Sequence, residues 1–165
     1  MQNKELQHFY NTVYKKGEQK HYTSLLFFGD KIPPAKAEVL KEISWKGKSV
    51  LDAGCGTGEL AYEIARAGAH EVIGIDYSRE AIAVAGKTYS HPNLRYRCDD
   101  LSGVQEKFDV IVSLGTLEHL DDPFVALKNL KSKLKPGGSL IITCPNWTNP
   151  RGYILLALKF LFNAP

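Results

Sequence analysis

Three glycines at alternate positions, Gly54, Gly56 and Gly58, constrain the fold of this chain more than any other feature. They follow a short apolar stretch that is typical of the end of a buried strand and that contains Asp52. The next residues, Glu59–Arg66, open a helix. A strand that turns into a helix through glycines brings bare backbone close to a ligand. One or two glycines would be enough for a turn without a ligand, so the run predicts a ligand-binding loop.

The spacing of these glycines separates two kinds of nucleotide site. Dinucleotide-binding loops have the spacing G-x-G-x-x-G. Here the third glycine comes one residue earlier, and Glu59 stands where the dinucleotide pattern has glycine. The spacing therefore disfavours a nicotinamide-dependent oxidoreductase, which stays open as an alternative.

The order of the predicted elements indicates a doubly wound α/β fold. Strands are predicted at 49–53, 71–76, 94–98, 108–113 and 139–144, and helices at 3–16, 33–43, 58–67, 78–88, 123–134 and 153–162. This alternation implies parallel pairing, right-handed crossovers and helices on both faces of one sheet. The expected strand order is 3-2-1-4-5, and ligands of such sheets bind at the carboxyl ends of the strands.

Length and composition suit a single domain. The chain has 165 residues, in which we expect a helical lid segment (1–44), a ligand-binding core (45–146) and the start of a substrate region (147–165). The formal charge of +3 is too small to indicate a nucleic-acid partner. No signal peptide is apparent, and the longest apolar run, 153–162, is about half of a membrane span. We expect a cytoplasmic location.

The three cysteines are predicted to be free thiols. Cys55, Cys98 and Cys144 lie at the ends of alternate predicted strands, which puts them roughly 10 Å or more apart. A disulfide needs Cα atoms closer than about 7 Å. None of the three has the C-x-x-C spacing of a zinc or redox site.

Acidic residues end the second and third predicted strands. Asp76 follows Gly58 by roughly 18 residues, where a carboxylate can accept hydrogen bonds from both hydroxyls of a ribose. Its alternative role is to cap the next helix, although Ser78 already suits that task. Asp99 and Asp100 follow the third strand, as part of either a binding site or a solvated acidic loop.

A second informative segment is 108–123, with the sequence FDVIVSLGTLEHLDDP. Together with the glycine run, it resembles motifs I and IV of the class I S-adenosylmethionine-dependent methyltransferases. It is especially similar to the small-molecule branch that includes quinone-biosynthesis enzymes, where Leu-Glu-His precedes an Asp-Pro helix start. Residues 133–143 resemble the family's turn into strand five. The resemblance covers about residues 45–146 and implies S-adenosylmethionine as the cofactor.

The resemblance also implies which residues bind this cofactor. They are Asp52, Ala53, Gly54, Cys55, Gly56, Gly58, Asp76, Tyr77, Asp99, Asp100, Leu101, Ser113 and Leu114. In that geometry Asp99 accepts from the adenine amino group, and the backbone N–H of Asp100 or Leu101 reaches a ring nitrogen. Tyr77 would flank the adenine or simply pack in the core. Ser113 and Leu114 would line the methionine portion.

His119 is the candidate catalytic residue, as a general base on a hydroxyl acceptor. Some quinone O-methyltransferases of this branch bind a metal through a Glu and a His here, and carry a further Glu where this chain has Gly115. That difference leaves too few ligands, so we expect no metal site. The remaining alternative is that Glu118 and His119 only cap or brace the loop.

The predicted function is methyl transfer from S-adenosylmethionine to oxygen or carbon of a small molecule, such as a quinone, lipid or sugar metabolite. No Asn-Pro-Pro-aromatic sequence follows strand four, which disfavours planar amides and nucleobase amines as acceptors. A catalytically silent cofactor-binding module is the alternative. The family's sheet usually has seven strands, so the chain is expected to be truncated after strand five. The apolar run 153–162 would then pack on missing segments or in a homodimer, and Tyr14 and Tyr22 are lid candidates.

Overall fold

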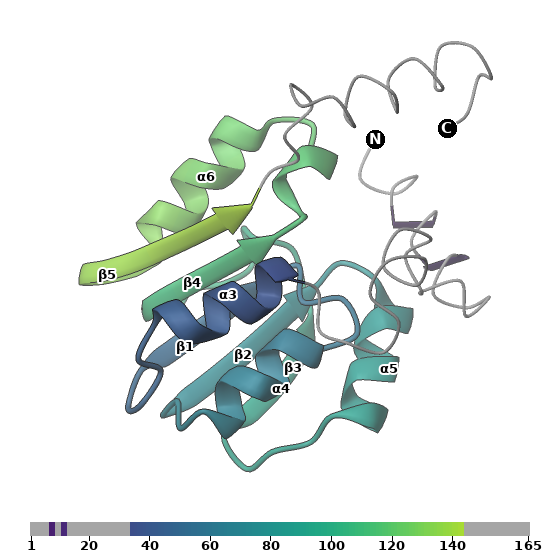
Figure 1. Cartoon of the computed structure of the whole chain (residues 1–165). Coiled ribbons are helices and arrows are strands. Elements are labelled where there is room, and N and C mark those ends of the chain that lie inside the picture. The colour runs from purple at the N-terminus through teal and green to yellow at the C-terminus, as the bar shows by residue number, and fades with distance from the viewer. Residues whose placement is uncertain (1–6, 9–10, 13–33, 144–165) are drawn as a thin grey trace.

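A computed structural model describes residues 7–8, 11–12 and 34–143 of the chain (Figure 1). These residues form a five-stranded parallel sheet with the order β3-β2-β1-β4-β5. The strands are β1 (Ser49–Ala53), β2 (Glu71–Asp76), β3 (Leu94–Cys98), β4 (Phe108–Leu114) and β5 (Leu134–Thr143). The helices are α3 (Pro34–Glu42), α4 (Glu59–Arg66), α5 (Arg79–Thr88) and α6 (Pro123–Ser132), with a 3-10 turn, η1 (Leu117–His119). The predicted doubly wound sheet and its strand order are confirmed.

Helices cover both faces of the sheet. On one face, α3 and α4 pack on alternate residues of the central strands, including Val50, Val72 and Val112. On the other face, α6 packs on the intervening residues, including Leu51 and Ile111. Every residue of β1 is buried, as expected for a central strand with helices on both sides.

The boundary between α6 and β5 differs from the prediction. Because Pro136-Gly137-Gly138 was expected to end a helix at 134, the strand was predicted to begin at residue 139. Instead α6 ends at Ser132 and β5 already begins at Leu134. Leu134 pairs with Phe108, and a register shift separates it from the Val110–Ser139 pair. A bulge on an outer strand tolerates proline and glycine there.

Several expectations from the sequence concern residues at the two ends of the chain. Residues 7, 8, 11 and 12 are helical, as predicted for 3–16. Cys55 and Cys98 are free thiols, as predicted. Cys144, Tyr14, Tyr22 and the run 153–162 lie outside the described residues.

Candidate cofactor-binding site

The glycine loop lies at the carboxyl edge of the sheet and is fixed to β2 by backbone hydrogen bonds. The N–H groups of Gly54 and Cys55 both donate to the carbonyl oxygen of Ile75, each at 2.9 Å. One residue further on, the N–H of Gly56 donates to Oδ2 of Asp76 at 2.8 Å. The loop and the acidic end of β2 therefore form one connected unit.

At two of the three glycines, a larger residue would clash with neighbouring side chains of the protein itself. Gly54 has φ +83°, and a Cβ there would lie 2.1 Å from Oγ1 of Thr116. Gly58 has φ +85°, and a Cβ there would lie 2.5 Å from the hydroxyl oxygen of Tyr96. That hydroxyl also donates to the carbonyl oxygen of Gly58 at 3.0 Å. The glycine pattern thus reflects close contacts inside the protein, which the sequence argument had not anticipated.

The carboxylate of Asp76 is held in place by backbone N–H donors. Besides Gly56, the N–H of Ser78 donates to its Oδ1 at 2.9 Å. The hydroxyl of Ser78 itself caps α5 by accepting from the N–H of Ala81. Burial raises the pKa of Asp76, and the bonds from Ser78 and Gly56 oppose that rise. The backbone N–H of Tyr77 is a further donor to this carboxylate. Because a carboxylate has about four acceptor positions, acceptor capacity remains for a ribose.

Asp52 is a buried carboxyl group with one unsatisfied oxygen. Its side chain is 2% exposed, and Oδ2 has no hydrogen-bond partner among the described residues. Burial raises the pKa of Asp52 to about 7, which the Lys36 ammonium opposes and the nearby Asp76 carboxylate reinforces. Lys36 is itself paired with Glu59 at 3.1 Å. A buried carboxylate with an unsatisfied oxygen is costly, so this position favours a ligand that brings a positive charge.

The acidic loop after β3 is folded on itself. The Asp99 carboxylate accepts from the N–H of Asp100 at 2.9 Å, and a Cβ at Gly103 would lie 2.0 Å from Oδ1 of Asp99. The Asp100 carboxylate accepts from the N–H groups of Ser102 and Gly103. The Ser102 hydroxyl also donates to this carboxylate, and its bond, together with the two backbone bonds, lowers the pKa of Asp100. The N–H of Asp100 therefore already donates to a carboxylate of its own loop. The adenine contacts expected of Asp99, Asp100 and Leu101 stay predictions.

Ser113 and Tyr77 make hydrogen bonds within the protein, and their predicted contacts with the cofactor stay predictions. Ser113 is fully buried, and its hydroxyl donates to the carbonyl oxygen of Ala53 at 3.0 Å. The carbonyl oxygen of Tyr77 accepts from Nε2 of Gln7 at 2.8 Å. Leu114 ends β4 and is partly exposed at the same edge.

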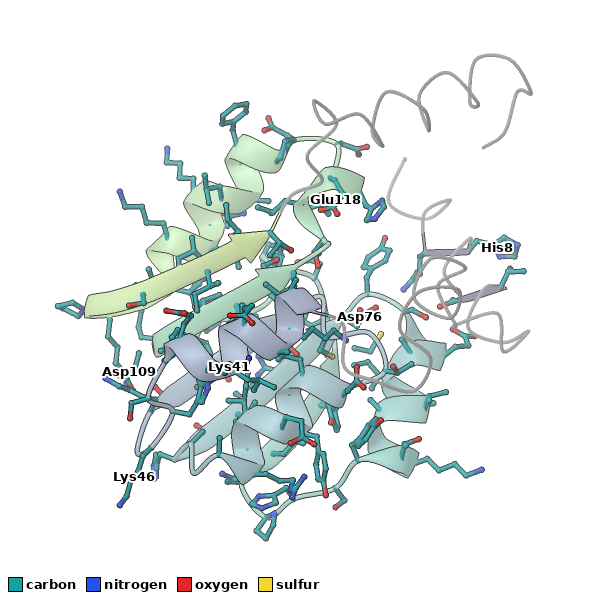
Figure 2. The ribbon with its side chains drawn as sticks, viewed as in Figure 1. His8, Lys41, Lys46, Asp76, Asp109 and Glu118 are labelled. Carbon is teal, nitrogen blue, oxygen red and sulfur yellow. The ribbon has the colours of Figure 1, made fainter. Side chains whose placement is uncertain are left out.

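Glu118 and His119 lie on η1, which follows β4 at the edge that carries the glycine loop. In Figure 2, Asp76 and Glu118 lie near the arrowhead ends of the strands, and Asp109 lies at the opposite ends. Glu118 and His119 are both exposed. Among the described residues no group of three His, Cys, Asp or Glu side chains could hold a metal ion. The roles of base and brace both stay predictions.

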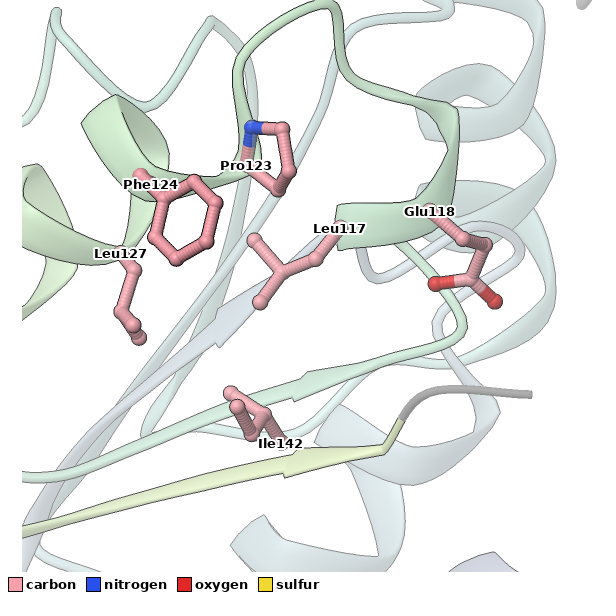
Figure 3. A pocket seen from close by; sticks show the side chains of 6 residues that line it. All are labelled: Leu117, Glu118, Pro123, Phe124, Leu127 and Ile142. Atoms are coloured by element: carbon pink, nitrogen blue, oxygen red, sulfur yellow. The ribbon is translucent and has the colours of Figure 1, made fainter. Parts of the chain in front are cut away.

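An apolar pocket of about 240 Å³ lies beside Glu118. Figure 3 shows Glu118 at one side of it. The other lining residues, which share an apolar character, are Leu117, Pro123, Phe124, Leu127 and Ile142. The pocket lies between η1, α6 and β5, on the face of the sheet that α6 covers. No sequence motif indicated this pocket.

Three contacts near the candidate site were not indicated by the sequence. Lys36 was taken only as part of a helix, yet its charge acts on Asp52. Thr116 lies against the glycine loop, and Asn11 accepts from the hydroxyl of Ser78 at 2.8 Å. All three contacts join segments that lie far apart in the sequence, so no local pattern could have shown them.

Comparison with known proteins places this geometry in a family. Residues 25–159 match the family model described as a methyltransferase domain. The ubiquinone biosynthesis O-methyltransferase of Coxiella burnetii is 36% identical over 141 residues, which are 80% of this chain and 59% of that protein. The tRNA U34 carboxymethyltransferase of Marinobacter nauticus is 35% identical over 133 residues, covering 77% of this chain and 38% of that protein.

A solved structure agrees in fold. Magnesium protoporphyrin IX methyltransferase from Synechocystis, crystallised with S-adenosylhomocysteine, superposes with a TM-score of 0.65 at 25% identity, covering 79% of this chain and 61% of that one. The chain belongs to the methyltransferase domain family and has the Rossmann-like fold of the class I S-adenosylmethionine-dependent enzymes. It spans about 59% of the length of the curated Coxiella relative.

Proposed function

We propose that this chain binds S-adenosylmethionine and transfers its methyl group to an oxygen or carbon atom of a small molecule. The observation that carries the proposal is the pair of carboxyl groups at the glycine loop, the buried Asp52 and the partly buried Asp76. S-adenosylmethionine brings an ammonium and a sulfonium at one end and ribose hydroxyls in the middle. Asp52 offers the unsatisfied oxygen that a cation requires, and Asp76 offers the free acceptor positions that a ribose requires.

The mechanism follows from what these residues can do. The sulfonium of the cofactor supplies a methyl group with a good leaving group, so an in-line displacement needs little covalent help from the protein. The residues of this chain hold the donor at the carboxyl edge of the sheet, beside the turn that carries His119. There His119 would take the proton of a hydroxyl acceptor as the oxygen attacks. Closure of the site against water would complete the arrangement.

The acceptor class rests on the relatives. Ubiquinone biosynthesis and magnesium protoporphyrin IX are named for two of them, and both names indicate a small or planar organic acceptor. The apolar pocket beside Glu118 would suit such a molecule. We therefore propose a quinone, lipid or sugar-type acceptor, and a cytoplasmic enzyme that needs no nucleic acid. No helix among the described residues is long and apolar enough to cross a bilayer.

Isothermal titration calorimetry with S-adenosylmethionine, S-adenosylhomocysteine and NAD tests the cofactor. We expect binding of the first two and not of NAD. Asp76→Ala should weaken the binding of S-adenosylmethionine at least tenfold, since it removes the carboxylate that accepts hydrogen bonds from the ribose. Glu38→Ala, at an exposed carboxylate paired with Lys41, is the matched control and should bind S-adenosylmethionine normally. Unchanged affinity in a folded Asp76→Ala protein would contradict the ribose assignment.

Turnover separates an enzyme from a silent module. Methyl-labelled S-adenosylmethionine is incubated with hydroxylated quinones, lipids, sugars and bulk tRNA, and label in each acceptor is counted. We expect label in a small-molecule fraction that is lost with Asp76→Ala. Label in tRNA alone would favour the second relative's substrate class. Cofactor binding with no transfer to any fraction would favour the silent module.

A further inference from the structure

The carbonyl oxygen of Ala53, at the end of β1, accepts hydrogen bonds from two side chains of the β4 end. The hydroxyl of Ser113 donates to it at 3.0 Å and that of Thr116 at 3.3 Å. The backbone pairing of β1 with β4 ends at Asp52 and Val112, one residue earlier. Two hydroxyl groups therefore continue the contact between the strands at the point where they separate, which is where ligands of this fold bind.

Thr116 also covers the first glycine of the loop. Its Oγ1, Cγ2 and Cβ would lie 2.1, 2.7 and 2.9 Å from a Cβ at Gly54. On its other side, Gly54 donates its N–H to Ile75 of β2. Gly54 is thus held between the hydrogen bond to β2 and the side chain of Thr116. A change at Thr116 would change the position of the loop.

The backbone of Thr116 belongs to a second functional segment. Its carbonyl oxygen accepts from the N–H of His119 at 3.1 Å, which closes the η1 turn. One residue therefore contacts the glycine loop with its side chain and holds the turn of Glu118 and His119 with its backbone. Ser113 shares the bond to Ala53 but lies within β4 and not in the turn.

We infer that Thr116 is a positioning residue that fixes the distance between the glycine loop and η1. On the proposed function, which this inference rests on, that distance separates the methyl donor from the candidate base. A displacement of about 1 Å at such a site can cost on the order of 100-fold in rate. The hydroxyl of Thr116 would thus act on catalysis without touching either substrate.

The test compares Thr116→Val, which replaces the hydroxyl by a methyl group, with Thr116→Ser, which keeps the hydroxyl. Amide exchange and chemical shifts are measured by NMR on the unliganded protein, and S-adenosylmethionine affinity by calorimetry. In Thr116→Val we expect amide exchange of Gly54 to accelerate at least tenfold, the His119 amide signal to shift, and affinity to fall at least fivefold. Thr116→Ser should stay within twofold of the original protein.

Ser113→Ala serves as the matched control, because it removes the other hydroxyl bond to Ala53. It should accelerate exchange at Gly54 while leaving the His119 signal in place. The inference is overturned if Thr116→Val moves only one of the two segments, or if Thr116→Ser behaves like Thr116→Val. Thr116→Ala replaces Thr116→Val if that variant does not fold. The NMR readouts need no cofactor, so a failure of S-adenosylmethionine binding in the original protein refutes the proposed function alone.

Discussion

Asp52 is the residue whose charge depends most on what occupies the site. In the folded chain its carboxyl group is buried, and its pKa rises from 3.8 to about 7. The groups that face it are Lys36 from α3, Asp76 from β2 and the backbone of Ala61 from α4. Burial raises the pKa of Tyr96 from β3 and of Cys55, and the charge of Asp52 adds to both rises. At neutral pH the group is therefore close to half protonated.

This shift makes a prediction about stability. Because the folded state binds the proton more tightly than the unfolded state, Asp52 weakens folding progressively as pH rises from about 4 to 7. Asp52→Asn removes that dependence. We expect the variant to be more stable than the original protein at pH 8, by at most about 4 kcal/mol, and equal to it near pH 4. Urea unfolding at both pH values measures the difference, and an equal difference at both would refute the assignment.

The same shift makes a prediction about cofactor binding. A cationic ligand favours the ionised form of Asp52, so S-adenosylmethionine should bind more weakly at pH 6 than at pH 8. In Asp52→Asn the affinity should be lower at both values and lose most of this pH dependence. Calorimetry at the two pH values supplies the measurement. An unchanged pH dependence in the variant would place the titrating group elsewhere.

Residue patterns predicted strand ends better than side-chain roles. Asp52 and Asp76 could be placed because a carboxylate at a strand end has a fixed position relative to a parallel sheet. The hydroxyl of Ser113 could not, because whether a strand-end side chain points to a ligand or to the neighbouring strand depends on the register. The direction of the Asp99 side chain could not be predicted either, and its carboxylate accepts a hydrogen bond from the N–H of Asp100 in its own loop.

Among the elements, the five strands of the sheet were predictable because buried apolar runs alternated with amphipathic helices. The start of β5 was not, since proline and two glycines normally mark the end of a helix. Here they form a bulge against the start of β4. A Cβ at Gly138 would lie 3.0 Å from the carbonyl oxygens of Asp109 and Lys135 and 3.1 Å from that of Phe108. Such tertiary contacts are invisible in the local sequence.

Gly138→Ala tests the bulge. The new methyl group would press on three backbone oxygens that cannot move as a side chain can, so we expect a loss of about 1–3 kcal/mol of stability. Gly86→Ala is the matched control, because Gly86 lies within α5 with no atom within 4 Å of the new methyl group. The free energy of unfolding of that variant should rise by about 0.5–1 kcal/mol, because alanine favours a helix more than glycine does. Equal effects of the two changes in urea unfolding would argue against the close contacts at the bulge.

The N-terminal segment makes contacts that suit its predicted role as a lid. Gln7 donates to the carbonyl oxygen of Tyr77, and Asn11 accepts from Ser78. Both contacts lie on the turn that follows Asp76. If this segment covers the bound cofactor, Gln7→Ala combined with Asn11→Ala should speed release of S-adenosylmethionine at least fivefold in stopped-flow measurements. Thr12→Ala, at an exposed hydroxyl bonded to His8, should leave the rate unchanged. Equal rates in all three proteins would exclude the lid role of these contacts.

Over the whole molecule, the two edges of the sheet have different tasks. The carboxyl edge carries the glycine loop, Asp76 and η1, as Figure 2 shows for the labelled residues. At the amino edge, the Asp109 carboxylate accepts from Ser49 and Lys135, which ties β1, β4 and β5 together. These donors hold the pKa of Asp109 well below its usual range. This structural cluster thus lies away from the edge where chemistry is proposed.

One outer surface of the molecule carries more exposed apolar side chains than the rest of the described part. Phe124 is 82% exposed and Val125 55%, both at the start of α6, and Ile142 of the outer strand β5 is 39% exposed. Phe124 and Ile142 also line the apolar pocket. An exposed apolar face beside an outer strand favours association with another apolar surface. The sequence suggested association through 153–162, and this face is a second place for it.

Phe124→Ser tests whether this face associates. Since the ring is mostly exposed, the change should alter stability by no more than about 0.5 kcal/mol. It should lower the binding of a hydrophobic dye and shift the weight-average mass toward the monomer in sedimentation at high protein concentration. Lys128→Ser, at an exposed position of the same helix, is the control and should change neither quantity. If the original protein is monomeric and Phe124→Ser leaves dye binding unchanged, the face is not an association surface, and the exposed ring would then be available to an apolar acceptor at the mouth of the pocket.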